Sequence, residues 1–275
     1  MSWSRGEDIF GYDENNKLHR AVRLLLLAAV SLAAFILIWW FISIIADTPS
    51  VPSPKKTLDA LVDLYLHGDR MTHTSLGSYV KSSLATFVKG FMLAIAVAVP
   101  VGLILGYSKT LRDLANPVIE ILRPIAPIAW APIFIISMGY TVGPMLVVFV
   151  GIFFPLLTNV IFGVRKIDPV WIDAARTLGS SQIQVFYKVM MPSAVPYMMN
   201  GVKVGLGVGW MCIVAAELYA SPLGGIGFYL AEQATSGYWP GAYAALVVIA
   251  VLGLLTIGVA DYIHRALSKR MGMDV

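Results

Sequence analysis

Charged side chains are scarce in this 275-residue sequence. Asp, Glu, Lys and Arg together make up 13% of it, against about 25% in an ordinary soluble domain. Hydrophobic residues make up 58%. A chain with so few polar groups is not expected to cover a soluble fold, so lipid is the predicted solvent for most of it. At about 20 apolar residues per crossing, the length allows roughly five to seven transmembrane helices.

Cysteine and histidine are also sparse. Cys212 is the single cysteine and lies in an apolar run, which excludes a disulfide framework and a cysteine metal site. The four histidines are scattered, and no two of them form a pair at helical ligand spacing alongside a carboxylate. No set of titratable residues suggests one reactive pocket. We therefore expect no metal site and no catalytic site in this chain.

A phosphate-binding loop is missing too. The sequence contains no Gly-x-x-x-x-Gly-Lys-Ser/Thr motif, so the chain is not expected to be a P-loop ATPase itself. The glycines between 201 and 209 resemble a glycine-rich nucleotide loop in number, but they lie within an apolar segment. Small residues at such spacing are typical of close helix packing.

Six apolar segments are long enough to cross a bilayer. The predicted spans are 24–46, 82–107, 116–138, 145–164, 196–218 and 241–263. Pro124, Pro127 and Pro132 interrupt the third span, which we therefore expect to be kinked or broken. A short amphipathic helix is predicted at 55–66, between the first two spans.

Lys and Arg are distributed unequally between the two predicted sides. With the N-terminus inside, the outer segments hold only Lys55, Lys56 and Arg70, and the inner segments hold most of the others. Basic residues accumulate on the cytoplasmic side of membrane proteins, so both termini are predicted to be cytoplasmic. The predicted organisation is a cytoplasmic segment 1–23, one transmembrane domain 24–264 and a cytoplasmic tail 265–275.

The polar stretch 165–192 carries the signals of a cytoplasmic helical hairpin. Asp168 and Pro169 suit the N-cap and first position of a helix. Gly179 suits the left-handed position at its end. Ser180 and Ser181 can cap a second helix, which is predicted to run to about Met191 and to stop at Pro192.

The first helix of this hairpin is too short to span a membrane and carries an apolar stripe. The stripe consists of Trp171, Ala174, Ala175 and Leu178. It can enter a groove in another protein, where small residues at 174 and 175 allow close approach. It can equally lie on lipid headgroups. The stripe alone leaves both interpretations open.

The hairpin resembles the signature loop of permease subunits of ABC importers. That signature reads Glu-Ala-Ala, three residues, Gly, nine residues, Ile-x-Leu-Pro. Here Asp173-Ala174-Ala175, Gly179 and Val189-Met190-Met191-Pro192 keep the spacing, with conservative differences at 173, 189 and 191. The resemblance implies that the loop forms the coupling helix that enters a groove of the ATP-binding subunit. The coupling residues it implies are Trp171, Asp173, Ala174, Ala175, Leu178, Gly179 and Pro192.

The similarity runs from about Pro52 to the C-terminus and is closest to the branch that imports nitrate, sulfonates and taurine. It implies an all-α, polytopic permease of the type I ABC-importer kind, forming the path for a small solute, which we expect to be an anion. It also implies that ATP and Mg bind a separate ATPase subunit, so no cofactor is expected in this chain. The expected partners are that ATPase, a second permease copy in a homodimer, an extracytoplasmic solute-binding protein and lipid, with no nucleic acid.

Six residues are candidates for the lining of a translocation path: Trp130, Met138, Lys203, Trp210, Met211 and Glu217. Lys203 would suit an anionic solute if it faced a central cavity, and would otherwise extend to an interface. Glu217 could line the exit, or cap its helix and bond the glycine-rich loop 224–227. The aromatic and Met side chains could instead be packing residues.

An ion-gradient-driven secondary transporter or channel is the alternative. It would require carboxylates near the middle of the spans as an ion or proton site. The predicted spans offer almost none, which favours the importer interpretation.

Overall fold

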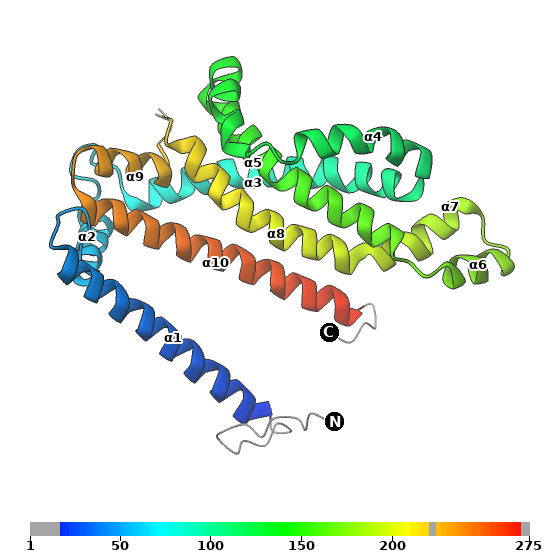
Figure 1. Cartoon of the computed structure of the whole chain (residues 1–275), viewed down its shortest axis with the longest axis horizontal. Helices are drawn as coiled ribbons and strands as arrows, with labels where there is room; N and C mark the ends of the chain where they lie inside the picture. The colour runs from blue at the N-terminus through cyan, green and yellow to red at the C-terminus, as the bar shows by residue number, and fades with distance from the viewer. Residues whose placement is uncertain (1–16, 220–223, 271–275) are drawn as a thin grey trace.

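The computed structural model describes residues 17–219 and 224–270, and in these ranges the chain is helical with no strand (Figure 1). The helices are α1 (Lys17–Ala46), α2 (Pro54–His67), α3 (Leu76–Tyr107), α4 (Lys109–Leu122), α5 (Ala131–Arg165), α6 (Pro169–Thr177), α7 (Gln182–Val185), α8 (Met191–Glu217), α9 (Ile226–Thr235) and α10 (Trp239–Arg270). A 3-10 turn, η1 (Pro127–Trp130), precedes α5, and a π-helical turn, η2 (Phe186–Met190), precedes α8.

The centre of the bundle consists of α3, α5 and α8. Glycines on α3 let α5 approach closely: a Cβ on Gly90 would lie 2.8 Å from Val148, and one on Gly102 would lie 2.7 Å from Val160. Such small residues are the usual means of close helix packing in membranes. Later residues of α3 meet later residues of α5 in these two contacts, so the two helices run parallel.

The next two helices alternate in direction. Gly151 of α5 lies against Cys212 of α8, and Gly163 lies against Tyr197, so α5 and α8 are antiparallel. The α8 and α10 helices are also antiparallel and lie side by side in Figure 1. The bundle therefore has two ends. One holds α6 and α7, and α10 ends on that side, whereas the other holds α2 and α9, where α1 joins the bundle (Figure 1).

Among the described residues, five helical runs are long and apolar enough to cross a membrane. They cover 22–46, 76–107, 127–165, 182–217 and 239–266. The predicted third span, 116–138, is not one helix, because it is divided between α4, the non-helical residues 123–126, η1 and the start of α5. Prolines 124 and 127 cannot donate to a helical ladder there, which agrees with the expected break. The count of six crossings stays a prediction.

The predicted turn at 139–144 is much tighter in the structure. A single residue, Gly139, departs from helical geometry with φ 76° and ψ 173°, and α5 bends sharply (Figure 1). This conformation is open to glycine and strained for other residues. The fourth predicted span, 145–164, is the part of α5 that follows the bend.

The first and last helices are longer than the predicted first and last spans. Helix α1 begins at Lys17, inside the predicted segment 1–23, and α10 continues to Arg270, past the predicted limit at 264. Residues 1–16 and 271–275 lie outside the described part. Helix α1 meets the bundle through Trp39, whose Nε1 donates to Pro52 O at 3.1 Å and whose ring stacks on Tyr243.

Candidate functional site

The first helix of the predicted hairpin is α6, and it is capped at both ends. The N-cap Asp168 accepts a hydrogen bond from Val170 N at 2.9 Å, as its position in the sequence predicts. At the other end Gly179 has φ 82°. Ser180 N donates to Ala175 O at 3.0 Å and Gly179 N to Arg176 O at 2.9 Å, which is the Schellman arrangement. The predicted left-handed glycine is confirmed.

The second helix begins as predicted but does not end as predicted. Ser181 and Gln184 form a reciprocal capping box, with Ser181 N donating to Gln184 Oε1 at 2.9 Å. Helix α7 is only four residues long, and the π turn η2 then leads directly into α8. The predicted stop at Pro192 is wrong: Pro192 lies in the first turn of α8. There its missing N–H is tolerated, and the wider π turn precedes it.

Contacts with the bundle hold this hairpin in place. Ile172 and Ala175 pack against a buried cluster that includes Val164 and Val185. Farther along, the ring of Tyr107, at the end of α3, meets Phe186 edge-on at 5.9 Å. The hairpin is therefore packed directly against the central helices.

The opposite face of α6 is apolar and exposed. Trp171 is 66% exposed and Leu178 is 85% exposed, with Ala174 on the same face and Val170 beside it. Ala175 was expected on this stripe but turns inward instead. The reason is that a helix of nine residues can show only one face to solvent while it packs the other. Both the protein-groove and the lipid-headgroup interpretations of the stripe therefore concern the exposed residues Val170, Trp171, Ala174 and Leu178.

Polar residues surround the exposed face, which we call the α6 face (Val170, Trp171, Ala174 and Leu178). Asp173 is 72% exposed and lies 3.8 Å from Arg176 Nη1. Exposed basic residues stand at Arg165, Lys166 and Lys188. An apolar centre with a polar rim is the usual anatomy of a protein-binding surface.

Replacing Gly179 tests how far the α6 face depends on its orientation. A Gly179→Val variant is expected to lose solute uptake while inserting normally in the membrane, because a β-branched residue at φ 82° costs on the order of 1–2 kcal/mol and displaces α6. Nothing lies within 4 Å of an added Cβ, so the effect is conformational. Gly179→Asn is the control, since Asn tolerates this conformation, and it should keep most uptake. Equal uptake by both variants and the parent would contradict this role of the turn.

Glu217 lies at the opposite end of the bundle, inside a buried network. Its side chain is 3% exposed, and Oε2 accepts hydrogen bonds from Ser83 Oγ and Gly227 N, both at 2.9 Å. Ser83 Oγ in turn accepts from Ile226 N at 2.9 Å. A Cβ at position 225 or 227 would meet the Glu217 side chain, which explains the glycines there. Glu217 thus joins the end of α8 to α3 and α9.

A second acidic residue, Asp69, organises the outer edge of the same end. Its carboxylate accepts from Thr72 Oγ1 at 2.7 Å, Tyr79 OH at 3.0 Å and Gln233 Nε2 at 3.1 Å. Burial alone would raise the pKa of Asp69, but the hydrogen bonds from Thr72, Met71 and Tyr79 together hold that pKa below its ordinary value. The charged form therefore stabilises the α2–α3 connection.

This shift predicts an acid-sensitive contribution to stability. A folded-state pKa below the unfolded one stabilises the fold above about pH 4, and the stabilisation is lost as the pH falls through the folded value. The melting temperature of the parent should therefore exceed that of Asp69→Asn at pH 6, and the gap should narrow below about pH 4. Melting curves of both proteins from pH 3 to 7 would test this. A gap that is constant with pH would contradict it.

The six path candidates do not gather in one place. Trp210 is buried, stacks on Phe87 and donates to Thr256 Oγ1 at 2.8 Å. The next residue, Met211, is 73% exposed. That Trp210 or Met211 contacts the solute stays a prediction.

The other candidates are similarly dispersed. Lys203 forms an ion pair with Asp261 of α10. The two surroundings that the sequence predicts for Lys203 are a central cavity and an interface, and neither includes this partner. Met138 is 58% exposed beside the bend in α5. Trp130 stacks on Phe134. Sequence reasoning missed Asp261 as a partner for Lys203, although opposite charges in two apolar segments were a usable signal.

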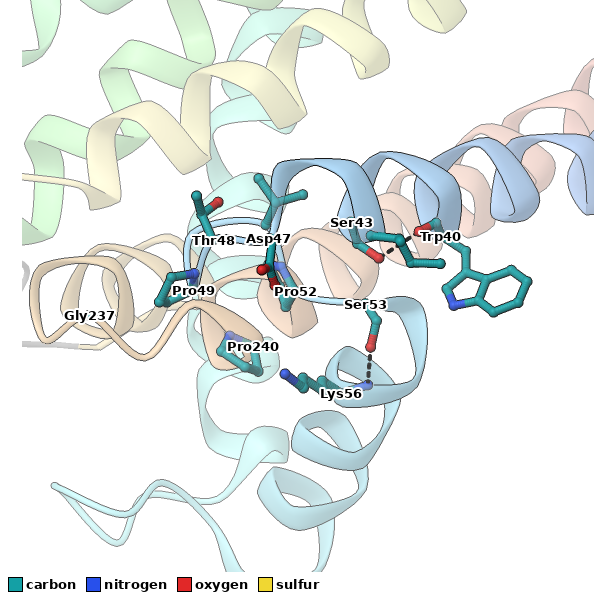
Figure 2. A pocket seen from close by; sticks show the side chains of 12 residues that line it. Trp40, Ser43, Asp47, Thr48, Pro49, Pro52, Ser53, Lys56, Gly237 and Pro240 are labelled. Atoms are coloured by element: carbon teal, nitrogen blue, oxygen red, sulfur yellow. Dashed lines mark hydrogen bonds between the residues drawn. The ribbon is translucent and has the colours of Figure 1, made fainter.

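A cavity of about 600 Å³ lies at the end of the bundle that holds α2. Figure 2 shows Asp47, Lys56 and Pro240 around it, at the junction of α1, α2 and α10. No sequence signal pointed to it, because its walls join residues 40–56 to Gly237 and Pro240, which are distant in sequence. It is remote from the α6 face, which lies at the other end (Figure 1).

Five membrane-length helical runs define a multi-pass helical membrane protein, and a capped, exposed hairpin lies at one end of it. The sequence profile of the family described as binding-protein-dependent transport system inner membrane component matches residues 98–273. The chain belongs to this family and is an inner-membrane transport component of the ABC permease class.

Similar proteins include permeases with named solutes. The chain is 31% identical to the taurine transport system permease protein TauC of Escherichia coli, over 90% of each chain. It is 29% identical to the nitrate import permease protein NrtB of Synechocystis sp., over 82% of this chain and 83% of NrtB. It is 28% identical to the bicarbonate transport system permease protein CmpB of Synechococcus elongatus, over 90% and 91%.

A solved structure shows the same fold. A chain of the MetNI methionine ABC transporter, in an inward-facing conformation, is 21% identical and has a TM-score of 0.61. The match covers 70% of this chain and 95% of that one. The predicted all-α, type I permease architecture is confirmed at this level.

Proposed function

We propose that this chain forms the membrane path of an ATP-driven importer for a small anion, and that the α6 face couples it to a separate ATPase subunit. The observation that carries the proposal is the exposed, doubly capped helix α6, fixed on the central bundle by Ile172 and Ala175. In this arrangement α6 transmits force and performs no chemistry.

The proposed cycle uses two copies of the chain around a central path. ATP draws the two ATPase subunits together, which moves the α6 hairpins and opens the path to the outside. Hydrolysis resets the path. ATP and Mg bind the ATPase, and this chain holds no cofactor. The family description supports the binding-protein partner, and we place its docking at the end that holds α2 and α9.

The orientation of the chain follows from its charge. The end that carries α6 also carries Lys109, Arg112, Arg165, Lys166 and Arg265, whereas the other carries Lys55, Lys56, Arg70 and Lys81. Basic residues favour the cytoplasmic side, so we place the α6 face and both termini there. An ATPase in the cytoplasm would then reach α6 directly.

The similarity to TauC, NrtB and CmpB supports a small anion or zwitterion as the solute, of the taurine, nitrate or bicarbonate kind. Membrane vesicles from a host expressing the importer would test the class. We expect uptake of one of these solutes to require ATP and to survive an ionophore that collapses ion gradients. Uptake that is lost with the ionophore and indifferent to ATP would favour a secondary transporter.

A further inference from the structure

A second cavity, of about 270 Å³, lies between α5, α8 and the break that follows α4. Arg123 and Pro127 line it from the break, Phe154 and Asn159 from α5, and Val204 from α8. Its size is close to the lower end for small-molecule sites, about 300 Å³. None of the six predicted path residues lines it.

The cavity is placed deep within the membrane-spanning part. Val204 is the middle residue of α8 (Met191–Glu217), so the cavity is about half-way between the two ends of that helix. The 14 residues of α4 would place Arg123 about 20 Å from the end of the bundle at which α4 begins. Both measures give a depth near the middle of a bilayer whose apolar core is about 30 Å thick.

Two features that a bilayer penalises meet at this cavity. The helix is interrupted after Arg123, whose N–H still donates to Ile119 O at 2.9 Å, and broken backbone at membrane depth is tolerated where it is buried in protein or lines a wet cavity. Arg123 adds a permanent charge, which is expensive at this depth and marks a functional site by default. Residues 123–126 are exposed in the single chain, and Arg123 borders the cavity there.

The charge of Arg123 has no counter-ion in the described part of the chain. No carboxylate lines the cavity, and no ion pair there includes Arg123. The neighbouring polar groups are engaged elsewhere: Thr158 Oγ1 donates to Phe154 O, and Asn159 Nδ2 donates to Pro155 O at 2.8 Å. The guanidinium of Arg123 is therefore the hydrogen-bond donor in this cavity that we expect to bind a ligand.

We infer that the Arg123 cavity is a binding site for the transported solute, and that it takes a small oxyanion by a two-pronged contact with the guanidinium. The planar fork of Arg matches nitrate, sulfonate and carboxylate groups. Val204 and Phe154 supply the apolar walls. This inference rests on the proposed function and deepens it, since it gives the path a point of anion selection at mid-depth.

Protection of a cysteine from alkylation tests the site without the ATPase. The full chain with Val204→Cys, in lipid nanodiscs, is treated with N-ethylmaleimide in sodium nitrate, sodium ethanesulfonate or sodium bicarbonate, and in urea as an uncharged reference. Val204 is 46% exposed, whereas the native Cys212 is buried. We expect at least one anion to slow labelling at position 204 about threefold or more relative to urea.

Matched charge variants identify the group responsible. Arg123→Gln should weaken anion protection about tenfold or more, as expected for loss of a charged hydrogen-bonding partner. Arg123→Lys should keep part of it. Lys89→Gln, which removes a cation from α3 outside the cavity, should keep all of it. If no anion protects position 204 of the chain with native Arg123, the inference is overturned even should the Arg123 variants fail to fold. Protection that persists in Arg123→Gln overturns it too. Neither result bears on the ATPase contact, which is measured separately.

Discussion

A Leu178→Asp variant is expected to lose its ATPase subunit and all ATP-driven uptake. Leu178 is 85% exposed at the end of the α6 face, so the change should not disturb the packing of the chain itself. A carboxylate placed in the apolar centre of a docking surface must be desolvated without a partner, which typically costs several kcal/mol. The measurement is the amount of ATPase that co-purifies with the tagged permease from native membranes, together with uptake in vesicles.

Leu66→Asp provides the matched control. Leu66 is 65% exposed on α2, at the opposite end of the bundle, and the same substitution there should leave ATPase recovery unchanged. Equal recovery with Leu178→Asp and the parent would mean that α6 does not dock on the ATPase.

Replacing Glu217 by Leu is expected to cause the largest loss of stability. The substitution leaves Ser83 Oγ and Gly227 N without their acceptor in a buried place, at a cost on the order of 3 kcal/mol for the two groups together. Thermal unfolding in detergent should show a melting temperature several degrees lower than that of the parent.

Glu217→Gln separates the acceptor from the shape of the side chain. Gln keeps one side-chain oxygen that can receive the bond from Gly227 N, so its melting temperature should lie between those of the parent and Glu217→Leu. Should Glu217→Leu melt at the temperature of the parent, the network would contribute nothing to stability. Loss of uptake in Glu217→Gln at unchanged stability would instead place Glu217 on the solute path.

Local signals in the sequence predicted the hairpin well. Asp168, Gly179 and Ser181 act through neighbours within a few residues, so their roles can be read from spacing alone. Pro192 failed as a stop signal because a proline in the first turn of a helix carries no penalty. Whether Pro192 begins one helix or ends another depends on the geometry before it, which the π turn supplies.

Features that depend on contacts between distant segments could not be predicted from local spacing. Ala175 and Leu178 have the same apolar character, and only the packing of α6 on the bundle shows that one is covered and the other exposed. The ion pair between Lys203 and Asp261 joins two residues that lie 58 positions apart in sequence, on different helices. The Arg123 cavity likewise needs three segments to be brought together.

Site-directed crosslinking from position 178 would show what the α6 face contacts in the membrane. The full chain with Leu178→Cys carries a photo-reactive group at that thiol in native membranes, and Leu66→Cys carries it at the opposite end. We expect a crosslinked product from position 178 that contains a P-loop ATPase, and none with that subunit from position 66. Crosslinks from position 178 to lipid alone would contradict the account and identify α6 as a helix that lies on the membrane surface.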